Sequence, residues 1–492
     1  MDVPVCGVVL AAGLGTRMRS DMPKALHHVG GVPMVSLVCE ALRQNGISPI
    51  IAVVSPEAPE VAAAVGAEVL IVPQHERLGT GHAAAQALEV MPAEGLALIT
   101  FGDTPLLRAE TLRALVAAHV GAHQSEPRLG ATLVSAVLED PAGYGRVVRD
   151  QDGWVADLVE QGDCTPEQAA IKEIFAGILI APVAVLRQYL PRLRQDNAQR
   201  EYLLTDVPRL IVSGGGLVAA FIAAPEEVRG VNSRRQLAEA NQLIWRRELD
   251  RLMEQGVTVL DPTSTFVSPG VAVGRDTIIW PGCYLLGRTE VGADCRIGPQ
   301  AYLEDAVLGR SVSVRFSTVE GSEVGDEVTI GPYSHIRPGT HLGDQVKVGN
   351  FAEIKNSRVG AGSKVSHHSY VGDAELGQGV NVGAGAVFVN YDGRDKHSTR
   401  VADGAFIGCN ANLVAPLELG HQAYIACGST INRDVPDGAL AIGRARQRNV
   451  LDWVTRRTGQ RALRGHAKRV RGSAPKPRQR DKTQEPETEP RK

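Results

Sequence analysis

Two patterns of apolar residues divide the chain. Up to about residue 230, short aliphatic runs alternate with segments of helical periodicity. The runs predict buried strands within residues 5–13, 47–55, 96–103, 131–138 and 216–224, and the periodic segments predict helices within residues 33–46, 81–91 and 109–120. This alternation predicts an α/β domain over residues 1–230 with a mostly parallel sheet. Its ligand site is expected beyond the carboxyl ends of the strands.

A long helical pattern follows the α/β segment. Residues 233–255 place Leu237, Ile244, Leu249 and Leu252 at helical spacing, and Gly256 is a suitable stop signal. We therefore expect a connecting helix over residues 231–256.

From Val267 to Gly420 the pattern changes to recurring aliphatic–glycine pairs. Examples are Val273-Gly274, Val291-Gly292, Ile297-Gly298, Val324-Gly325, Ile330-Gly331, Leu342-Gly343, Val348-Gly349, Leu376-Gly377 and Val382-Gly383. Several are separated by six residues or a multiple of six, which is typical of hexapeptide repeats. Chance clustering in a glycine-rich chain would not hold this phase across successive coils. The pattern predicts a left-handed parallel β-helix over residues 257–453, with a protruding and functional loop where residues 390–399 break the period.

Composition narrows the class of protein. A chain of 492 residues is too long for one core. No apolar stretch approaches the roughly 20 residues of a membrane span, and residues 5–10 read as a first strand rather than a signal peptide. The seven cysteines are scattered, without C-x-x-C spacing, which argues against a disulfide framework or a zinc site and favours a cytoplasmic location.

Charge is concentrated at the carboxyl end. Residues 456–492 carry 13 Lys or Arg and 4 Asp or Glu, which leaves the rest of the chain near −12 because the whole is −3. Residues 454–492 are therefore expected to be a disordered basic tail. A solvated appendage is the expected role. Nucleic acid is not an expected partner beyond nonspecific contact with this tail.

A glycine-rich turn, LAAGLGTRM at residues 10–18, follows the first predicted strand. Its backbone N–H groups can surround phosphate oxygens. Arg17 offers a planar fork to phosphate, and Lys24 adds a point charge. The turn is neither a dinucleotide fingerprint nor a P-loop, because it lacks a third glycine and a Gly-Lys-Ser/Thr. By itself it could also be an ordinary strand–helix turn.

A carboxylate stands at the end of another predicted strand. Phe101-Gly102-Asp103 follows the run LALIT, so Asp103 should lie at the same edge of the sheet as the glycine-rich turn. One carboxylate with phosphate oxygens and water suits Mg²⁺. The alternative role of Asp103 is to cap the next turn.

These motifs resemble those of sugar-nucleotide pyrophosphorylases, whose signature is LAAGxGTRM followed by PK. The finer resemblance, over roughly residues 5–453, is to the bifunctional N-acetylglucosamine-1-phosphate uridyltransferase/glucosamine-1-phosphate acetyltransferases. It implies a Rossmann-like nucleotidyltransferase domain. It implies uridine-nucleotide contacts from Leu10, Ala11, Ala12, Gly13, Gln74, Gly79, Thr80, Phe101 and Gly102; phosphate contacts from Arg17 and Lys24; Mg²⁺ ligation by Asp103 and Asn232; and sugar contacts from Gly145 and Glu160.

Phe175 departs from that resemblance. The family has an N-x-G segment that hydrogen-bonds the sugar, and the aligned run here is Phe175-Ala176-Gly177. An unmade hydrogen bond costs on the order of 1–3 kcal/mol. Weaker sugar binding, a weakened uridyltransferase, or a preference for another sugar phosphate is therefore an open alternative.

The repeat segment carries matching residues in the same order as the family. The resemblance implies that His367 is the general base that takes a proton from the 2-amino group, a task that suits an imidazole. A lone histidine would more often be structural, and His368 stands beside it. The resemblance also implies that glucosamine-1-phosphate contacts Arg337, Lys355, Tyr370 and Asn381, and that acetyl-CoA contacts Ala384, Asn390, Tyr391, Cys409, Cys427 and Arg444.

Two of these positions differ from the family pattern. Cys409 stands where a serine is expected and Cys427 where an alanine is expected, and a thiol is a weaker donor than a hydroxyl. Homotrimers with acetyl-transfer sites between subunits are what the resemblance implies for assembly.

The expected protein is thus a bifunctional enzyme of UDP-N-acetylglucosamine synthesis. It would acetylate glucosamine-1-phosphate with acetyl-CoA and then transfer uridylyl from UTP with Mg²⁺, feeding peptidoglycan, lipopolysaccharide and other cell-envelope precursors. A non-catalytic scaffold or nucleotide sensor that keeps the fold is the rival from another class.

Overall fold

The computed structural model of the protein describes residues 3–13, 15–197 and 199–454. The described residues up to Ile442 form one compact unit, and those from Gly443 to Val454 belong to a second. The first unit holds the α/β domain and the β-helix. The predicted basic tail lies outside the described residues except for its first residue, Val454.

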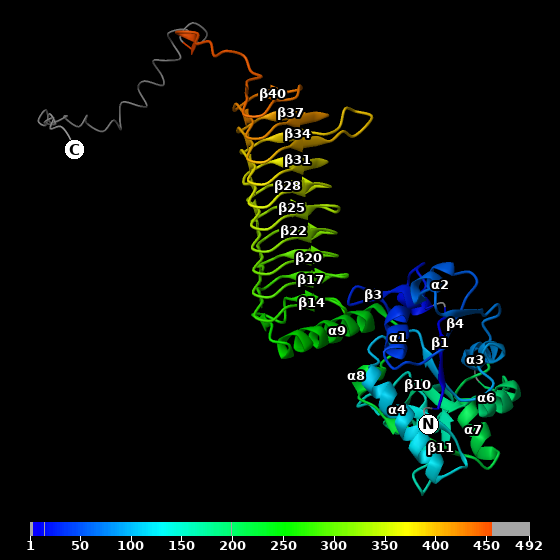
Figure 1. Ribbon diagram of the computed structural model, residues 1–492. Coiled ribbons are helices and arrows are strands. Elements are labelled where there is room, and N and C mark those ends of the chain that lie inside the picture. Colours follow the sequence, from blue (N-terminus) through cyan, green and yellow to red (C-terminus); the bar gives the residue numbers. More distant parts are fainter. Residues whose placement is uncertain (1–2, 14, 198, 455–492) are drawn as a thin grey trace, which may run out of the picture. The chain divides into compact units, whose positions relative to one another are not determined.

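A nine-stranded sheet forms the centre of the α/β domain (Figure 1). Along its main path the order is β11 (Leu217–Ile222), β7 (Leu129–Val137), β10 (Glu173–Pro182), β6 (Leu96–Phe101), β1 (Val5–Leu10), β4 (Ile50–Val54) and β5 (Leu70–Pro73). Six of these strands run in one direction and β10 runs against its neighbours β6 and β7. A hairpin of β8 (Arg146–Arg149) and β9 (Val155–Val159) joins through β10. The prediction of a mostly parallel sheet is confirmed.

Helices cover both faces of this sheet. Val8 and Val9 are adjacent in β1 yet belong to two different apolar cores, because successive side chains of a strand point to opposite faces. One core is closed by α1 (Met34–Arg43), α2 (Pro59–Val65) and α4 (Ala109–Ser125), and the other by α3 (Thr80–Gln86), α6 (Val183–Tyr189) and α7 (Asp206–Ser213). Short helices α5 (Pro166–Ala169) and α8 (Pro225–Val228) and a small ladder of β2 (His28–Val29) with β3 (Val32–Pro33) complete the domain.

The expected connecting helix is α9 (Arg234–Glu254), which Ser233 caps through a bond from Gln236 N. Its last two turns belong to the core of the repeat segment, since Leu249 and Leu252 cluster with the aliphatic residues of the coils. Arg251 also donates to the Val271 carbonyl at 2.8 Å. The helix therefore closes the first end of the β-helix.

The repeat segment is a left-handed β-helix of three parallel sheets (Figure 1). Face 1 contains β12 (Thr258–Val259), β15 (Ile278–Ile279), β18 (Arg296–Ile297), β21 (Ser313–Val314), β24 (Thr329–Ile330), β27 (Lys347–Val348), β30 (Lys364–Val365), β33 (Asn381–Val382), β36 (Phe406–Ile407), β39 (Tyr424–Ile425) and β41 (Leu440–Ala441). Face 2 contains β13 (Phe266–Val267), β16 (Tyr284–Leu286), β19 (Tyr302–Glu304), β22 (Thr318–Glu320), β25 (His335–Ile336), β28 (Glu353–Lys355), β31 (Tyr370–Gly372), β34 (Val387–Val389), β37 (Asn412–Val414) and β40 (Thr430–Ile431). Face 3 contains β14 (Ala272–Val273), β17 (Glu290–Val291), β20 (Val307–Leu308), β23 (Glu323–Val324), β26 (His341–Leu342), β29 (Arg358–Val359), β32 (Ala374–Leu376), β35 (Thr399–Val401) and β38 (Leu417–Leu419).

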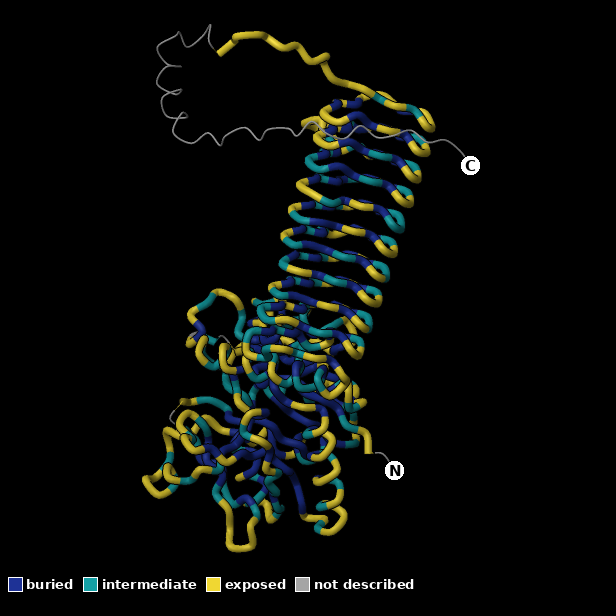
Figure 2. Tube along the Cα trace, turned by 90° about the vertical axis from the view of Figure 1, so that its left-hand side faces the viewer, coloured by how far each residue is buried: buried dark blue, intermediate teal, exposed yellow. Residues whose placement is uncertain are grey.

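Aliphatic side chains fill the interior of the coils. Ile279 pairs with Ile297, which pairs with Val314, and each is fully buried. Figure 2 shows buried positions alternating with intermediate and exposed ones along every coil. One short strand per hexad thus buries one aliphatic residue, and the predicted hexapeptide architecture is confirmed.

The expected loop leaves the coils between β34 and β35 (Figure 1). Leu376 of β32 pairs with Val401 of β35, so this coil is longer than its neighbours by the inserted loop. Within the loop Tyr391 and Lys396 form an isolated antiparallel bridge. In the described part of the chain, no helix is both long and apolar enough to cross a membrane.

Candidate functional sites

A cavity of about 630 Å³ opens at the carboxyl ends of β1 and β6. Almost all the residues expected to contact nucleotide or sugar line it: Leu10, Ala11, Ala12, Gly13, Lys24, Gln74, Gly79, Thr80, Phe101, Gly102, Asp103, Gly145, Glu160, Phe175 and Asn232. Arg17 does not line the cavity but reaches its edge, where its Nη2 donates to Asn232 Oδ1 at 3.0 Å. The sheet edge predicted for ligand binding is therefore where the hollow lies.

The ammonium group of Lys24 lies between the two expected metal ligands, Asp103 and Asn232. The Lys24 ammonium forms an ion pair with Asp103 Oδ2 and donates to Asn232 Oδ1 at 3.0 Å. Asp103 Oδ1 is buried and has no hydrogen-bond partner among the described residues. An oxygen pair that attracts a cation, with one lone carboxylate oxygen to spare, fits Mg²⁺, which uses one or two carboxylates together with phosphate oxygens.

The cavity wall at Gly79 and Thr80 is built by close contact between two segments. Gly81 N donates to the Tyr202 carbonyl at 2.8 Å, and Leu204 N donates to Thr80 Oγ1 at 3.0 Å. Gly79 has a φ of +114°, and a Cβ there would stand 2.5 Å from the Tyr202 carbonyl oxygen. The contact therefore requires glycine at this position.

Replacing Gly79 with alanine should lower uridylyl transfer by at least about tenfold and lower the thermal midpoint, because a strained φ alone costs of order 1–3 kcal/mol and the clash adds to it. Pyrophosphate release and a melting curve measure the two effects. Gly153→Ala is the matched control: Gly153 has a φ of +87° but nothing within 4 Å of the added Cβ. Equal effects from both variants would contradict the role of the close contact.

Glu160 lines the cavity just after β9. Thr205 Oγ1 donates to its carboxylate at 3.0 Å, and a Cβ at Gly145 would come within 3.8 Å of it. Burial raises the pKa of Glu160, against the lowering effect of the Thr205 hydrogen bond. A half-desolvated acceptor of this kind suits the hydroxyl groups of a sugar.

Phe175 occupies the wall where the family resemblance places an amide. Its side chain is 7 % exposed and belongs to the same apolar core as Val147 and Leu158, and its N–H donates to the Gly145 carbonyl at 2.9 Å. The aromatic ring therefore gives the cavity an apolar surface at this point.

A corner column on the β-helix gathers residues that are far apart in sequence. Two residues beyond the aligned aliphatic positions of face 1, Asn350, His367, Ala384, Cys409 and Cys427 lie on consecutive coils. Backbone bonds join each to the next: His368 N to Asn350 O at 3.1 Å, Gly385 N to His367 O at 3.1 Å, Asn410 N to Ala384 O at 2.8 Å and Gly428 N to Cys409 O at 2.8 Å. We call these five residues the corner column.

Asn350 determines the protonation pattern of His367. The imidazole Nδ1 lies 2.5 Å from Asn350 Oδ1, and an amide oxygen can only accept. Nδ1 therefore carries the hydrogen, and in the neutral imidazole Nε2 presents its lone pair from an exposed side chain. A neutral imidazole with one free lone pair is the form that acts as a base.

His368 has a different environment from His367. Its ring stacks on Phe351 at 4.9 Å, and Phe351, Tyr333 and Phe316 continue the stack along the corner. This stacking gives His368 a structural role.

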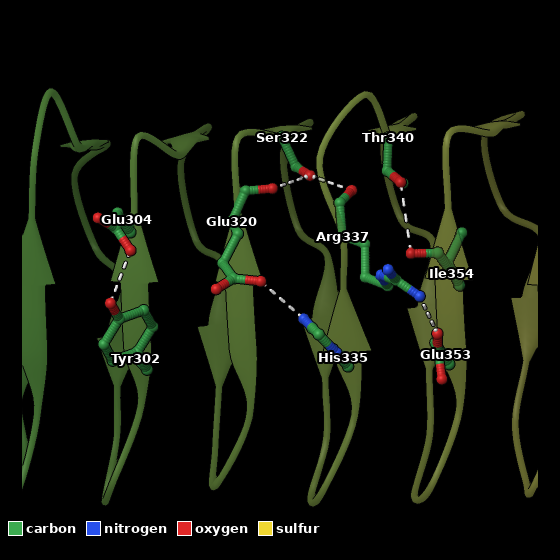
Figure 3. Close-up of polar contacts among 9 residues, drawn as sticks. All are labelled: Tyr302, Glu304, Glu320, Ser322, His335, Arg337, Thr340, Glu353 and Ile354. Carbon is green, nitrogen blue, oxygen red and sulfur yellow. Dashed lines mark hydrogen bonds and ion pairs between the residues drawn. The ribbon is translucent and has the colours of Figure 1, made fainter.

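Charged side chains line face 2 beside the corner column. Arg337 and Lys355 occupy equivalent positions on successive coils, because Ile336 pairs with Ile354. Arg337 pairs with Glu353 at 2.8 Å and His335 pairs with Glu320 at 2.8 Å. Figure 3 shows the two pairs next to each other. Glu353 uses one nitrogen of the guanidinium, so further N–H groups can donate elsewhere.

Tyr370 lies next to hydrogen bonds made by Asn390, the first residue of the protruding loop. Asn390 Nδ2 donates to Asp373 Oδ2 at 2.5 Å and lies 3.4 Å from Tyr370 Oη. Burial would raise the pKa of Asp373, but hydrogen bonds from Asn356 and Asn390 outweigh it and leave the pKa below its usual value. The Asp373 carboxylate thus anchors the loop in its ionised form.

Lys396 was missed in the sequence analysis. The Lys355 ammonium beside it lowers the pKa of Lys396, through a hydrogen bond and charge repulsion. Two neighbouring ammonium groups, with Arg337 one coil away, make a strong site for a dianion. The only sequence signal was a lysine inside the loop that breaks the repeat.

The structure does not bring every expected residue together. Asn381 projects from face 1, around the corner from Arg337 and Lys355 on face 2. Tyr391 is exposed in the loop. Arg444 belongs to the second unit, where it is exposed, so its expected contact with acetyl-CoA stays a prediction.

Both the α/β domain and the β-helix resemble known protein families. Residues 7–202 match the MobA-like NTP transferase domain, and residues 268–316 and 321–356 match the bacterial transferase hexapeptide repeats. The chain is 47 % identical over 450 residues to the bifunctional protein GlmU of Caldanaerobacter subterraneus subsp. tengcongensis, covering 92 % of this chain and 97 % of that one. It is 45 % identical over 449 residues to that of Carboxydothermus hydrogenoformans, covering 91 % and 99 %.

The chain belongs to the bifunctional GlmU family. It is a bifunctional transferase of UDP-N-acetylglucosamine synthesis, with a nucleotidyltransferase half and a hexapeptide acyltransferase half. Its substrates are acetyl-CoA and UTP with the phosphorylated amino sugar, Mg²⁺ supports uridylyl transfer, and the product serves peptidoglycan synthesis.

Several cavity residues of this GlmU chain had gone unassigned in the sequence analysis. Arg77, Thr104, Tyr144 and Thr205 all line the hollow, and Thr205 holds Glu160. They come from four loops at the same sheet edge, and such proximity is set by the fold rather than by any local motif.

Proposed function

We propose that the cavity of the α/β domain is the uridylyl-transfer site of this GlmU-family chain. The arrangement of Lys24 between Asp103 and Asn232 carries this assignment, since it gathers a cation and two oxygen ligands beside a glycine-rich turn. Asp103 and Asn232 would hold Mg²⁺, which when bound neutralises charge on phosphate oxygens.

The chemistry in this cavity needs alignment more than a protein nucleophile. An oxygen of the sugar phosphate attacks the α-phosphorus of UTP, and pyrophosphate leaves on the opposite side. Arg17 and Lys24, which both donate to Asn232 Oδ1, would neutralise the negative charge that grows on the phosphates. The wall at Gly79 and Thr80 holds the nucleotide, and Glu160 with Gly145 holds the sugar. The two sets of contacts together supply the alignment.

We assign acetyl transfer to the corner column and the adjacent part of face 2. The lone pair on His367 Nε2 takes a proton from the 2-amino group as its nitrogen attacks the acetyl carbonyl, and the coenzyme A thiolate leaves. Asn350 is a positioning residue that keeps the hydrogen on Nδ1. Arg337, Lys355, Lys396 and Tyr370 hold the phosphate of glucosamine-1-phosphate.

The small side chains above His367 favour a coenzyme A site on the same column. Ala384, Cys409 and Cys427 succeed one another on consecutive coils, which leaves room for an elongated ligand. Asn390 and Tyr391 would complete its contacts.

We further propose a cytoplasmic homotrimer with domains at residues 1–230, 231–256 and 257–453. The placement of Asn381 on face 1 favours it, because Arg337 and Lys355 lie on face 2 and a neighbouring subunit can join the two sets in one site. Analytical ultracentrifugation tests the assembly.

One incubation tests both assignments. Glucosamine-1-phosphate, acetyl-CoA, UTP and Mg²⁺ are supplied together, and free CoA thiol, pyrophosphate and UDP-N-acetylglucosamine are followed by mass analysis. All three should appear, and omission of acetyl-CoA should abolish the UDP-linked product from glucosamine-1-phosphate. Production of neither thiol nor UDP-sugar would refute the proposal.

The sugar specificity of the cavity needs its own test, because Phe175 stands where the family resemblance places an amide. If the missing amide weakens sugar binding, Phe175→Asn should lower KM for N-acetylglucosamine-1-phosphate roughly fivefold, since a hydrogen bond regained is worth on the order of 1 kcal/mol. The thermal midpoint should fall, because a buried aromatic ring is lost.

Phe175→Leu is the matched control, since it keeps an apolar side chain without an amide and should not lower KM. A panel of sugar phosphates with pyrophosphate release as readout shows whether the wild-type enzyme prefers a different sugar. A Phe175→Asn variant that folds but has an unchanged or higher KM would contradict the explanation.

A further inference from the structure

Two thiols lie in line with His367, and neither proposed reaction uses a protein thiol as a reactant. Cys409 and Cys427 occupy neighbouring coils of the corner column, and Gly428 N donates to the Cys409 carbonyl at 2.8 Å. Ile407 pairs with Ile425 two residues before each cysteine, so the two cysteines stand in the same register.

The spacing between coils matches the reach of a disulfide. Neighbouring parallel strands lie about 4.8 Å apart. Cα atoms of disulfide-linked cysteines are usually about 4.4–6.8 Å apart. Cysteines in register on adjacent coils therefore have Cα atoms within the range that a disulfide spans.

Cys409 and Cys427 are also distinguished by their access to solvent. Both are exposed, whereas Cys6, Cys39, Cys283 and Cys295 are buried. Burial raises the pKa of Cys6 and of Cys39 to about 11, which removes the reactive thiolate form. Cys164 has intermediate exposure and lies in the α/β domain, away from the column.

We propose that Cys409 and Cys427 form a reversible disulfide under mild oxidation and that this bond switches off acetyl transfer. One thiolate attacks a peroxide oxygen, gives a sulfenic acid and releases hydroxide, which becomes water with the proton of that thiol. The sulfur of the second cysteine attacks the sulfenic sulfur, forms the S–S bond and expels hydroxide, which takes the remaining proton. Two thiols and one hydrogen peroxide thus become one disulfide and two waters.

The effect on activity rests on the proposed acetyl-transfer site. The disulfide would lie on the second and third coils beyond His367, within the strip assigned to coenzyme A. Joining the two sulfurs fixes both side chains and alters the surface that the coenzyme must contact. The cavity of the α/β domain contains neither cysteine, so uridylyl transfer should not respond.

Peptide mapping tests the bond without reference to activity. Residues 401–433 contain no Lys or Arg before Arg433, so trypsin releases both cysteines on one peptide. After hydrogen peroxide and alkylation, this peptide should carry no alkyl groups and be lighter than its reduced form by two hydrogen atoms. Dithiothreitol should restore two alkylated cysteines.

Activity measurements then test the switch. In the full-length protein, peroxide should lower acetyl transfer at least tenfold and dithiothreitol should restore it, with uridylyl transfer unchanged. Cys409→Ser and Cys427→Ala are each compared with their own untreated samples, and both should lose the reversible response. Cys164→Ser is the matched control and should respond as the wild type does.

The outcomes separate this inference from the proposed function. Two alkylated cysteines at peroxide levels that oxidise a reference dithiol would overturn the disulfide. A disulfide that leaves acetyl transfer unaffected would overturn the switch. Absence of acetyl transfer in the reduced protein would instead refute the proposed function, while the mapping result would stand independently.

Discussion

Replacing His367 with alanine should reduce acetyl transfer at least a hundredfold and leave uridylyl transfer intact. Loss of a general base costs roughly a hundredfold to ten-thousandfold. Neither His367 nor its partner Asn350 lines the cavity of the α/β domain, so only one activity should change. Release of CoA thiol and release of pyrophosphate, measured on the same preparation, check the two halves.

His368→Ala is the matched control for this experiment. His368 is exposed like His367 but stacks on Phe351, so its loss should leave most of the acetyl transfer in place. Asn350→Ala should lower kcat and alter the pH profile, because Nδ1 would lose its acceptor. Unchanged acetyl transfer in the His367→Ala protein would favour the scaffold alternative for the β-helix.

The second large effect is expected from Asp103→Ala, which should lower uridylyl transfer at least about a hundredfold, the scale on which lost transition-state charge stabilisation is measured. The carboxylate forms an ion pair with the Lys24 ammonium, and its buried Oδ1 has no hydrogen-bond partner among the described residues. Its removal should therefore affect both Lys24 and the bound Mg²⁺. Pyrophosphate release at saturating Mg²⁺ measures the loss, and direct Mn²⁺ titration measures the metal affinity separately.

Asp152→Ala serves as the control, since Asp152 is an exposed carboxylate in the turn between β8 and β9. Acetyl transfer should be unaffected by either variant. If Asp103→Ala released pyrophosphate at the wild-type rate, the assignment of the cavity would be wrong and a nucleotide-sensing role would gain support.

Most of the fold could be predicted because its elements are continuous in sequence. The runs at β1, β4, β6, β7 and β11 are uninterrupted aliphatic segments, and the hexad phase of the coils is a local property. The strand β10 was missed although it is ten residues long. Its run contains Phe175 at the cavity, and the family resemblance assigned that segment a ligand contact, which concealed its place at the centre of the sheet.

The sites were only partly predictable because their residues meet across coils and loops. His367 was identified, but Asn350, seventeen positions earlier, was not, because the two meet only through the coil register. Lys396 likewise needs the loop to fold back toward Lys355. Such contacts depend on the length of each coil, and an amino-acid sequence specifies that length only through the register of all its strands.

That register also determines where the β-helix can tolerate inserted sequence. The loop at residues 390–399 lengthens one coil, yet Leu376 still pairs with Val401 and the stacking continues through β38. A segment added between two strands in this way is looped out, whereas one added within a strand would displace every later side chain by a fraction of a turn. Insertions are thus tolerated at the bends between strands. The residues beside a bend can change while the stacked interior keeps its packing.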